Sequence, residues 1–295
     1  MEIKLAFVIL NYNTYDDTVH CIESIHKYSG LRADELKIVI VDNASTDDSV
    51  TKLQAKYNNK EEIFIIRNND NLGFAKGNNV GIAYSLKEYD PEFIVVLNSD
   101  TELIQEGFYQ RIESEYKKSS FALLGPLVIN GKGRCDCSPF LEETIEQAYA
   151  TRKMQLRNRR RINTNTMNIH KAVRYFYFGI VKKKEVMNIH GDYHKRQINV
   201  VPSGCFLVFS RDAFNYISGF DERTFLYYEE QILFQHLKRF GLKTVYTPDI
   251  CIYHKEGIAS KQTNKTNKEK LLFECNCSLD SLDVLIDLLQ EVNNS

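Results

Sequence analysis

The sequence lacks any apolar run near the roughly 18 residues that a membrane-spanning helix needs. Its first residues, MEIKLAFVILNYN, turn polar too early for a secretory signal peptide. Neither sign of charge is in excess, since 38 lysines and arginines face 39 aspartates and glutamates, so the overall charge does not favour nucleic acid. We therefore expect a cytoplasmic protein that binds no nucleic acid.

Cysteine is too sparse for a secreted disulfide scaffold, because seven residues are scattered over 295. We expect reduced thiols. Two Cys-x-Cys pairs, Cys135/Cys137 and Cys275/Cys277, are spaced more closely than zinc ligands usually are, so we predict no metal there. The sequence also lacks the G-x-G-x-x-G of dinucleotide folds and a P-loop, because its glycines at 73, 77 and 81 lie four apart. This argues against an oxidoreductase or an ordinary kinase.

Apolar segments of strand length recur through the first hundred residues, with helical patterns between them. Their continuous apolarity is typical of strands that are covered on both faces, as in a mostly parallel sheet. Between the second and third segments we expect a helix capped by Ser45 or Thr46. The pattern predicts an α/β fold that begins βαβαβαβ, with strands at 5–10, 37–42, 63–67 and 93–98.

Polar side chains follow each of these strands at the point where it ends. They form the stretches 11–13, 42–45, 68–81 and 98–100. In parallel sheets the carboxyl ends of the strands meet at one edge, and ligands bind there. A carboxylate at this edge, such as Asp100, needs water, a cation or a hydrogen-bond partner. We therefore expect a ligand site at this edge.

The second half of the chain has a different character. Residues 151–161 (TRKMQLRNRRR) and 171–184 (KAVRYFYFGIVKKK) combine cations with aromatic and apolar side chains. This combination suits an anionic membrane interface or a phosphorylated substrate. A nucleic-acid patch and a plain solvated helix face are the alternatives.

Regular structure is expected again from residue 199. We predict an extended segment and short helix over 199–214, and a helix with Glu229 and Glu230 in its first turn, where the helix dipole favours carboxylates. A strand should then end at His254. An amphipathic helix over 278–292 should dock on the main body or on a partner.

The motifs ILNYN, VDNASTD, NLGFAKGNNVG, VLNSD, GFDERTFLYYEEQ and YHKEG follow one another in an informative order. Together they resemble the inverting nucleotide-sugar transferases of glycosyltransferase family 2, which have the GT-A fold, and especially the rhamnosyltransferase-like bacterial branch. The resemblance runs from about residue 4 to 257 and is sparse between 134 and 196. It implies a GT-A domain over 1–260, a Rossmann-like sheet flanked by helices, and a tail with an amphipathic helix over 261–295. Within that domain, 1–130 would bind the nucleotide-sugar, 131–198 would be an acceptor-facing or membrane-facing insertion, and 199–260 would form the acceptor and catalytic half.

The resemblance also assigns roles at the site. Asp100 would hold a divalent cation, Mg²⁺ or Mn²⁺, on the donor diphosphate, and His254 would complete the metal shell or touch the diphosphate. Glu230 falls at the position of the general base, where relatives carry the shorter Asp. Glu229 lies beside it in the sequence. The donor side would comprise Asn11, Asn13, Asp42, Asn43, Ser45, Gly73, Phe74, Gly77, Asn78 and Asn98. The acceptor side would comprise Ser203, Gly204 and Asp221.

The implied function is transfer of a sugar from a nucleoside diphosphate donor, dTDP-rhamnose or a UDP-hexose, in cell-surface polysaccharide synthesis. The acceptor would be a saccharide or a lipid-linked hydroxyl, and the basic aromatic stretch would contact the anionic inner face of the cell membrane. Two alternatives stay open. One is a non-catalytic protein that binds sugar nucleotides or polysaccharide. The other is a nucleotidyltransferase, although ILNYNTYDD lacks the Gly-rich basic loop that such enzymes carry.

Overall fold

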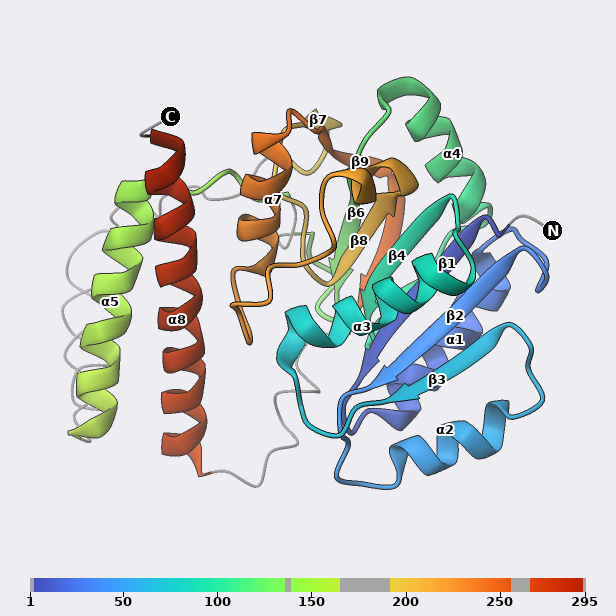
Figure 1. The fold of residues 1–295 in the computed structure, drawn as a ribbon, viewed down its shortest axis with the longest axis horizontal. Coiled ribbons are helices and arrows are strands. Elements are labelled where there is room, and N and C mark those ends of the chain that lie inside the picture. Colours follow the sequence, from blue (N-terminus) through green and yellow to red (C-terminus); the bar gives the residue numbers. More distant parts are fainter. Residues whose placement is uncertain (1–2, 136–138, 165–191, 256–265, 294–295) are drawn as a thin grey trace.

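The structure, a computed structural model, describes residues 3–135, 139–164, 192–255 and 266–293. It is built on a nine-stranded sheet with the order β3-β2-β1-β4-β8-β6-β9-β5, and β7 pairs with β9 outside this path (Figure 1). Pairing directions show that β1, β2, β3, β4, β6 and β9 run the same way. The expected α/β architecture with a mostly parallel sheet is confirmed.

The N-terminal half has the predicted alternation of strands and helices. The strands are β1 (Leu5–Asn11), β2 (Leu36–Asp42), β3 (Ile63–Arg67) and β4 (Phe93–Asn98). The helices between them are α1 (Tyr15–Tyr28), α2 (Ser49–Tyr57) and α3 (Gly73–Glu88).

The predicted cap of α2 was wrong. This helix begins at Ser49 with Asp48 at the N-cap position, rather than after Ser45 or Thr46. The Ser45 hydroxyl donates to Asp42 Oδ1 over 2.5 Å. The Thr46 backbone N–H donates to Asn13 Oδ1 over 2.8 Å. Bonds to the ends of β1 and β2 hold both residues outside the helix.

The second half completes the sheet with shorter elements. They are β5 (Thr101–Leu103), α4 (Phe108–Ser119), β6 (Leu123–Asn130), β7 (Gln197–Ile198), β8 (Phe206–Ser210), the 3₁₀ turn η1 (Arg211–Asn215), α7 (Glu229–Arg239) and β9 (Thr244–His254). Strand β8 runs antiparallel between β4 and β6. The extended segment and short helix predicted for 199–214, and the strand ending at His254, are confirmed.

Buried apolar side chains cover both faces of the sheet. Alternate residues of β1 point to opposite sides, so Phe7 lies with α1, α2 and α4, while Val8 lies with α3 and α7. The continuous apolarity of the strands follows from this two-sided burial. The sheet is therefore held between two helical layers, with its carboxyl edge left for other contacts.

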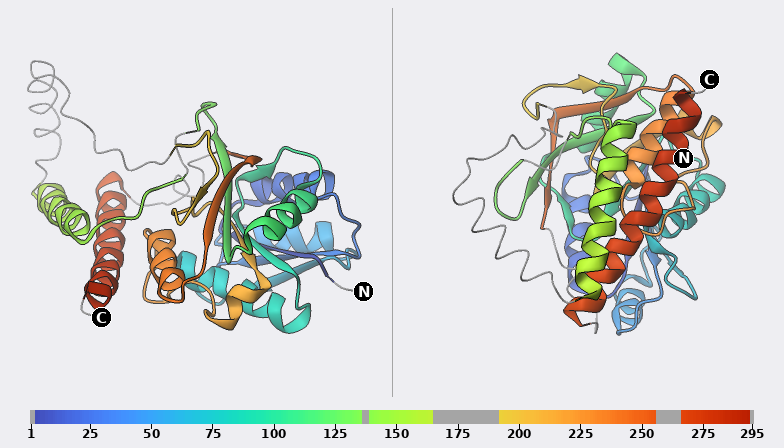
Figure 2. Two further views of the ribbon diagram at one scale, coloured as in Figure 1. Left: turned by 90° about the horizontal axis from the view of Figure 1, so that it is seen from above. Right: turned by 90° about the vertical axis from the view of Figure 1, so that its left-hand side faces the viewer.

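Two long helices lie side by side beyond α7 (Figures 1 and 2). They are α5 (Ile145–Asn163) and α8 (Asn267–Asn293), called here the α5/α8 pair. Ala148, Ile232 and Leu282 bring α5, α7 and α8 into one apolar cluster. The helix expected over 278–292 thus forms, begins earlier than predicted, and docks on the main body.

The basic stretch 151–161 lies on α5, and Arg152 pairs with Asp283 of α8. The second basic and aromatic stretch, 171–184, falls outside the described residues. Among the helices that the structure describes, none is both long and apolar enough to cross a bilayer.

Candidate functional site

Asp100 and His254 meet at the carboxyl edge of the sheet. Strands β5 and β9 pair so that Thr101 lies opposite His254, which places Asp100, the residue before β5, beside the end of β9. His254 Nε2 lies 3.2 Å from Asp100 Oδ1. Burial lowers the pKa of His254, but hydrogen bonds with Asp100 and Cys205 outweigh it and raise that pKa to about 10.

This pair fits a divalent cation as two of its ligands once His254 loses its proton, because only the neutral imidazole binds a metal. Carboxylate oxygen and imidazole nitrogen are both common ligands for such ions. Among the described residues, no group of three or more His, Cys, Asp and Glu side chains could hold a metal alone. A cation here would therefore need further oxygens from water or from a bound ligand.

A lysine adjoins the Asp100 end of the site. The Lys255 backbone N–H donates to the carbonyl of Asp100 over 3.0 Å. Its ammonium pairs with Asp17 at 2.9 Å, on the first turn of α1. The edge thus carries a fixed cation beside the Asp100 and His254 pair.

The predicted donor residues at the ends of β1 and β2 form one buried network. Asn11 Nδ2 donates to Asp42 Oδ1 over 2.7 Å, and the Ser45 hydroxyl donates to the same oxygen. The backbone N–H of Asn13 donates to Ser45 Oγ over 2.9 Å. Asn13 takes a left-handed conformation (φ 56°). These bonds fix the shape of the loops, and Asp42 is completely buried within them.

Asn43 connects this network to the loop before α3. Its side chain donates to Asn71 Oδ1 and to the carbonyl of Gly73, and it accepts from the Leu72 N–H. An added Cβ on Gly77 would lie 2.7 Å from Leu10 Cδ1, so glycine lets α3 approach β1 closely. Asn78 is buried and donates to the carbonyl of Phe74.

The helix that carries the two acids begins immediately after an unusual turn. Tyr227 and Tyr228 both have left-handed backbones (φ 76° and 65°), and α7 starts at Glu229. Glu230 is half-buried, and its Oε2 lies 3.2 Å from where a Cβ on Gly204 would be. Burial raises the pKa of Glu230 above its usual range.

Glu229 lies deeper than Glu230. It is 6% exposed, and its Oε1 has no hydrogen-bond partner. Burial, and then the charge of Glu230, raise the pKa of Glu229 to about 8, although hydrogen bonds from its own N–H and that of Tyr227 oppose the rise. At neutral pH this carboxyl is therefore mostly protonated.

Segment 203–205 touches both halves of the site. Gly204 faces Glu230, as described above. The carbonyl of Cys205 accepts from the Asn98 N–H over 2.9 Å, and the nearby Cys205 thiol helps to raise the pKa of His254. Asn98 is half-buried, and its partner Cys205 directly follows Gly204, the residue that faces Glu230. These contacts connect Glu230 to the Asp100 and His254 pair within one edge of the fold.

The other predicted acceptor residues make internal contacts. Ser203 Oγ lies 3.4 Å from the Cys205 thiol. Asp221 pairs with Arg223 at 2.6 Å and with His236 of α7 at 3.0 Å. Burial alone would raise the pKa of Asp221, but bonds from Arg223 and His236 hold it well below its usual range. Asp221 therefore anchors its loop on α7.

Residues 6–134 match the family model of glycosyl transferase family 2. The chain resembles this family. A curated relative, the low-salt glycan biosynthesis hexosyltransferase Agl10 of Haloferax volcanii, is 28% identical over 129 residues. That match covers 44% of this chain and 38% of the relative, so the chain aligns with well under half of the relative's length.

Solved GT-A glycosyltransferases share the fold. The structure of S. aureus TarS 1-349 in complex with UDP-GlcNAc has a TM-score of 0.55 at 15% identity, covering 99% of this chain and 71% of that chain. GalNAc-T7 with UDP, GalNAc and Mn²⁺ has a TM-score of 0.59 at 12% identity, covering 90% and 45%. The expected GT-A fold is confirmed.

The family 2 match includes the donor-side residues and Asp100 but ends before Ser203, Glu230 and His254. Sequence reasoning also missed Cys205, which contacts Asn98, and three residues at the turn before α7, namely Phe225, Ser278 and Ser281. Cys205 directly follows the predicted Ser203 and Gly204, which is a usable signal. No sequence signal pointed to the two serines, because each contacts a residue some fifty positions away in the chain.

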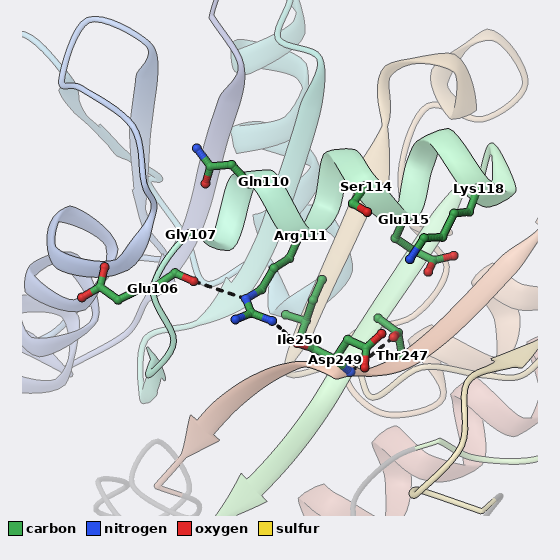
Figure 3. A pocket seen from close by; sticks show the side chains of 10 residues that line it. All are labelled: Glu106, Gly107, Gln110, Arg111, Ser114, Glu115, Lys118, Thr247, Asp249 and Ile250. Carbon is green, nitrogen blue, oxygen red and sulfur yellow. Dashed lines mark hydrogen bonds between the residues drawn. The ribbon is translucent and has the colours of Figure 1, made fainter.

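A separate hollow of about 390 Å³ lies between α4 and the middle of β9 (Figure 3). Arg111 crosses it, donating to the carbonyls of Glu106 and Asp249. Its lining includes none of the predicted site residues. The candidate site is therefore defined by the contacts at the sheet edge and not by this hollow.

Proposed function

We propose that this chain is an inverting glycosyltransferase. It transfers a sugar from a nucleoside diphosphate donor, dTDP-rhamnose or a UDP-hexose, to a hydroxyl of a saccharide or lipid-linked acceptor in cell-surface polysaccharide synthesis. The observation that carries the proposal is the connection of Asp100 to Glu230 through segment 203–205. The family 2 match of the donor half supports it.

In this proposal Asp100 and His254 hold a divalent cation, Mg²⁺ or Mn²⁺. Such an ion offsets the negative charge that a departing diphosphate accumulates. Asn98 lies next to this pair on the donor side. Lys255 adds a positive charge at the same edge, although Asp17 neutralises part of it.

The donor nucleotide would lie over the loops that follow β1, β2 and β3. The network fixes these loops before the donor arrives, which lowers the entropy cost of binding. Residues of this wall are Asn11, Asn13, Asp42, Asn43, Ser45, Gly73, Phe74, Gly77 and Asn78. Because Asp42 is wholly engaged by Asn11 and Ser45, it would shape the wall more than it touches the base.

Glu230 would act as general base and take the proton of the attacking acceptor hydroxyl. Its raised pKa brings it nearer to the working pH, which favours proton transfer. Glu229, being protonated, would add no second negative charge to the site. Ser203 and Gly204 would line the acceptor side, and Asp221 would hold the loop that leads to α7.

The chain would be organised as a GT-A domain over 1–260, with donor half 1–130, insertion 131–198 and catalytic half 199–260, followed by the tail 261–295. The exposed cations of α5, such as Lys153 and Arg157, would meet the anionic inner face of the membrane. Flotation with vesicles that contain phosphatidylserine tests this contact. The protein should rise with anionic vesicles and stay unbound to purely phosphatidylcholine vesicles, and absence from both would overturn it.

Donor binding can be tested by thermal shift with dTDP-rhamnose, UDP-glucose, UDP-galactose and UDP-GlcNAc, each with Mn²⁺. The donor should raise Tm by mass action, and EDTA should remove most of the rise. Asp100→Asn should abolish the part that depends on Mn²⁺. If no nucleotide-sugar changes Tm with or without Mn²⁺, the donor site is wrong.

Catalysis is tested by Glu230→Gln with the donor that binds. Loss of a general base should lower transfer by about 10²-fold to 10⁴-fold while donor binding persists. Glu222→Gln, an exposed acid in the preceding loop, is the matched control and should keep full activity. Donor binding without transfer in the wild type would instead favour the non-catalytic alternative.

A further inference from the structure

The turn Phe225–Tyr228 joins α3, α8 and the start of α7. The Phe74 N–H donates to the carbonyl of Phe225 over 2.8 Å. Gly73 makes this approach feasible, since an added Cβ would lie 2.4 Å from the same carbonyl oxygen. The turn therefore rests on the first residues of α3 from one side.

Helix α8 holds the turn from the other side. The hydroxyl of Ser281, which is completely buried, donates to the carbonyl of Leu226 over 3.0 Å. Burial raises the pKa of the Tyr228 hydroxyl, and the nearby hydroxyl of the buried Ser278 opposes that rise. The Phe225 ring meets Phe273 edge-on, with centroids 5.7 Å apart. Three successive turns of α8 thus contact this one segment.

Two consecutive tyrosines in the left-handed region are unfavourable, because their Cβ atoms crowd the backbone there. Such a conformation persists only when its surroundings impose it. It sets the direction in which α7 leaves the turn. It therefore also decides whether the Glu230 carboxylate faces Gly204.

We propose that Ser281 and Ser278 of α8 are positioning residues that hold the Leu226–Tyr228 turn and thereby place Glu230 against Gly204. The catalytic meaning of this placement rests on the proposed function. The C-terminal helix is then part of the site's machinery, although it contributes no group that touches substrate. This explains why buried hydroxyls occur on an α8 face that is otherwise apolar.

Hydrogen–deuterium exchange of the full chain tests the placement without any substrate. Ser281→Ala should speed exchange of peptides covering 225–234 by about tenfold, the effect of losing one buried hydrogen bond. Ser278→Ala should act in the same region, and Ser281→Thr should restore slow exchange because it keeps the hydroxyl. Gln290→Ala is the matched control, since its α8 side chain bonds Tyr149 of α5 and should leave 225–234 unchanged.

A second readout follows the Glu230 carboxyl by ¹³C NMR, assigned with Glu230→Gln. Ser281→Ala should lower the pKa of Glu230 toward its ordinary value, because a loosened turn admits water, and Gln290→Ala should not. Unchanged exchange together with an unchanged Glu230 titration in Ser281→Ala would overturn the inference. Full transfer by Glu230→Gln would instead overturn the role of Glu230 as general base and leave the exchange result standing.

Discussion

Glu229 and Glu230 are neighbours in sequence, yet they occupy different environments. Glu230 faces segment 203–205, whereas Glu229 points into the protein with an unpaired oxygen. Two adjacent acids tend to raise each other's pKa. In the structure burial is the larger cause for Glu229 and the charge of Glu230 comes second. Only the fold could reveal which of the two acids is buried.

Glu229→Gln should change how stability depends on pH. The pKa of Glu229 is about 8 in the folded protein and near 4.5 when unfolded. Between these values the folded state binds more protons, so the free energy of unfolding falls as pH rises, by at most about 1.4 kcal/mol per pH unit. Urea unfolding near pH 5 and near pH 8 measures this loss. The glutamine variant, which has no such titration, should lose less stability than the wild type.

The comparison can fail in a defined way. Equal losses of stability in the wild type and in Glu229→Gln would mean that Glu229 is ionised in the folded protein at neutral pH. Glu222→Gln gives the baseline, because Glu222 is an exposed acid of the preceding loop.

Helix α3 shows how one element can combine packing and site geometry. Glycines recur every fourth residue along it, and an added Cβ on Gly81 would lie 2.4 Å from Val8 Cγ1 and 3.0 Å from Val41 Cγ2. The same face carries Gly77 against Leu10 and Gly73 against Phe225. A four-residue spacing of glycines is by itself compatible with close packing on a strand and with close approach to a ligand. At Gly77 and Gly81 the nearest neighbours are strand side chains, and Asn43 Nδ2, just after β2, also lies 3.3 Å from an added Cβ on Gly77.

Gly81→Ala should therefore destabilise the protein by about 1–3 kcal/mol through overpacking. Helix propensity alone predicts the opposite sign, because alanine favours a helix interior by about 1 kcal/mol over glycine. Ala83→Gly, at an exposed position of α3, isolates the propensity effect and should cost about 1 kcal/mol. Urea unfolding midpoints of the wild type, Gly81→Ala and Ala83→Gly test this prediction. A Gly81→Ala protein as stable as the wild type would refute the steric argument.

Elements were predictable where the signal is local. The strands near 5–10 and 93–98 are apolar throughout, and their burial on both faces is all that this pattern requires. The cap of α2 was not predictable, since Ser45 and Thr46 are held by Asp42 and Asn13 across a strand boundary. The meeting of Asp100 with His254 could be predicted only through the family resemblance, because the two lie 154 residues apart.

At the scale of the whole molecule, the α5/α8 pair stands apart from the two apolar layers of the sheet. Its cluster reaches the main body through Ile232 and Tyr228 of the α7 region. Ion pairs of Arg152 with Asp283 and Arg239 with Glu291 add contacts at its margin. We therefore expect the pair to open more readily than the sheet, as a cooperative unit of its own.

Leu282→Ala tests whether the α5/α8 pair opens more readily than the sheet. The side chain is completely buried among α5, α7 and α8, so its truncation removes packing within the pair. A buried Leu→Ala change costs about 2–5 kcal/mol, so amide exchange along α5 and α8 should accelerate by at least about tenfold. Amides of β1 and β4 should keep their slow exchange if the pair opens separately.

Leu207→Ala, equally buried in β8, is the matched control and should speed exchange across the sheet. Equal acceleration of the sheet and the pair in Leu282→Ala would mean that the molecule opens as one unit, and the turn before Glu230 would then be as stable as the sheet itself.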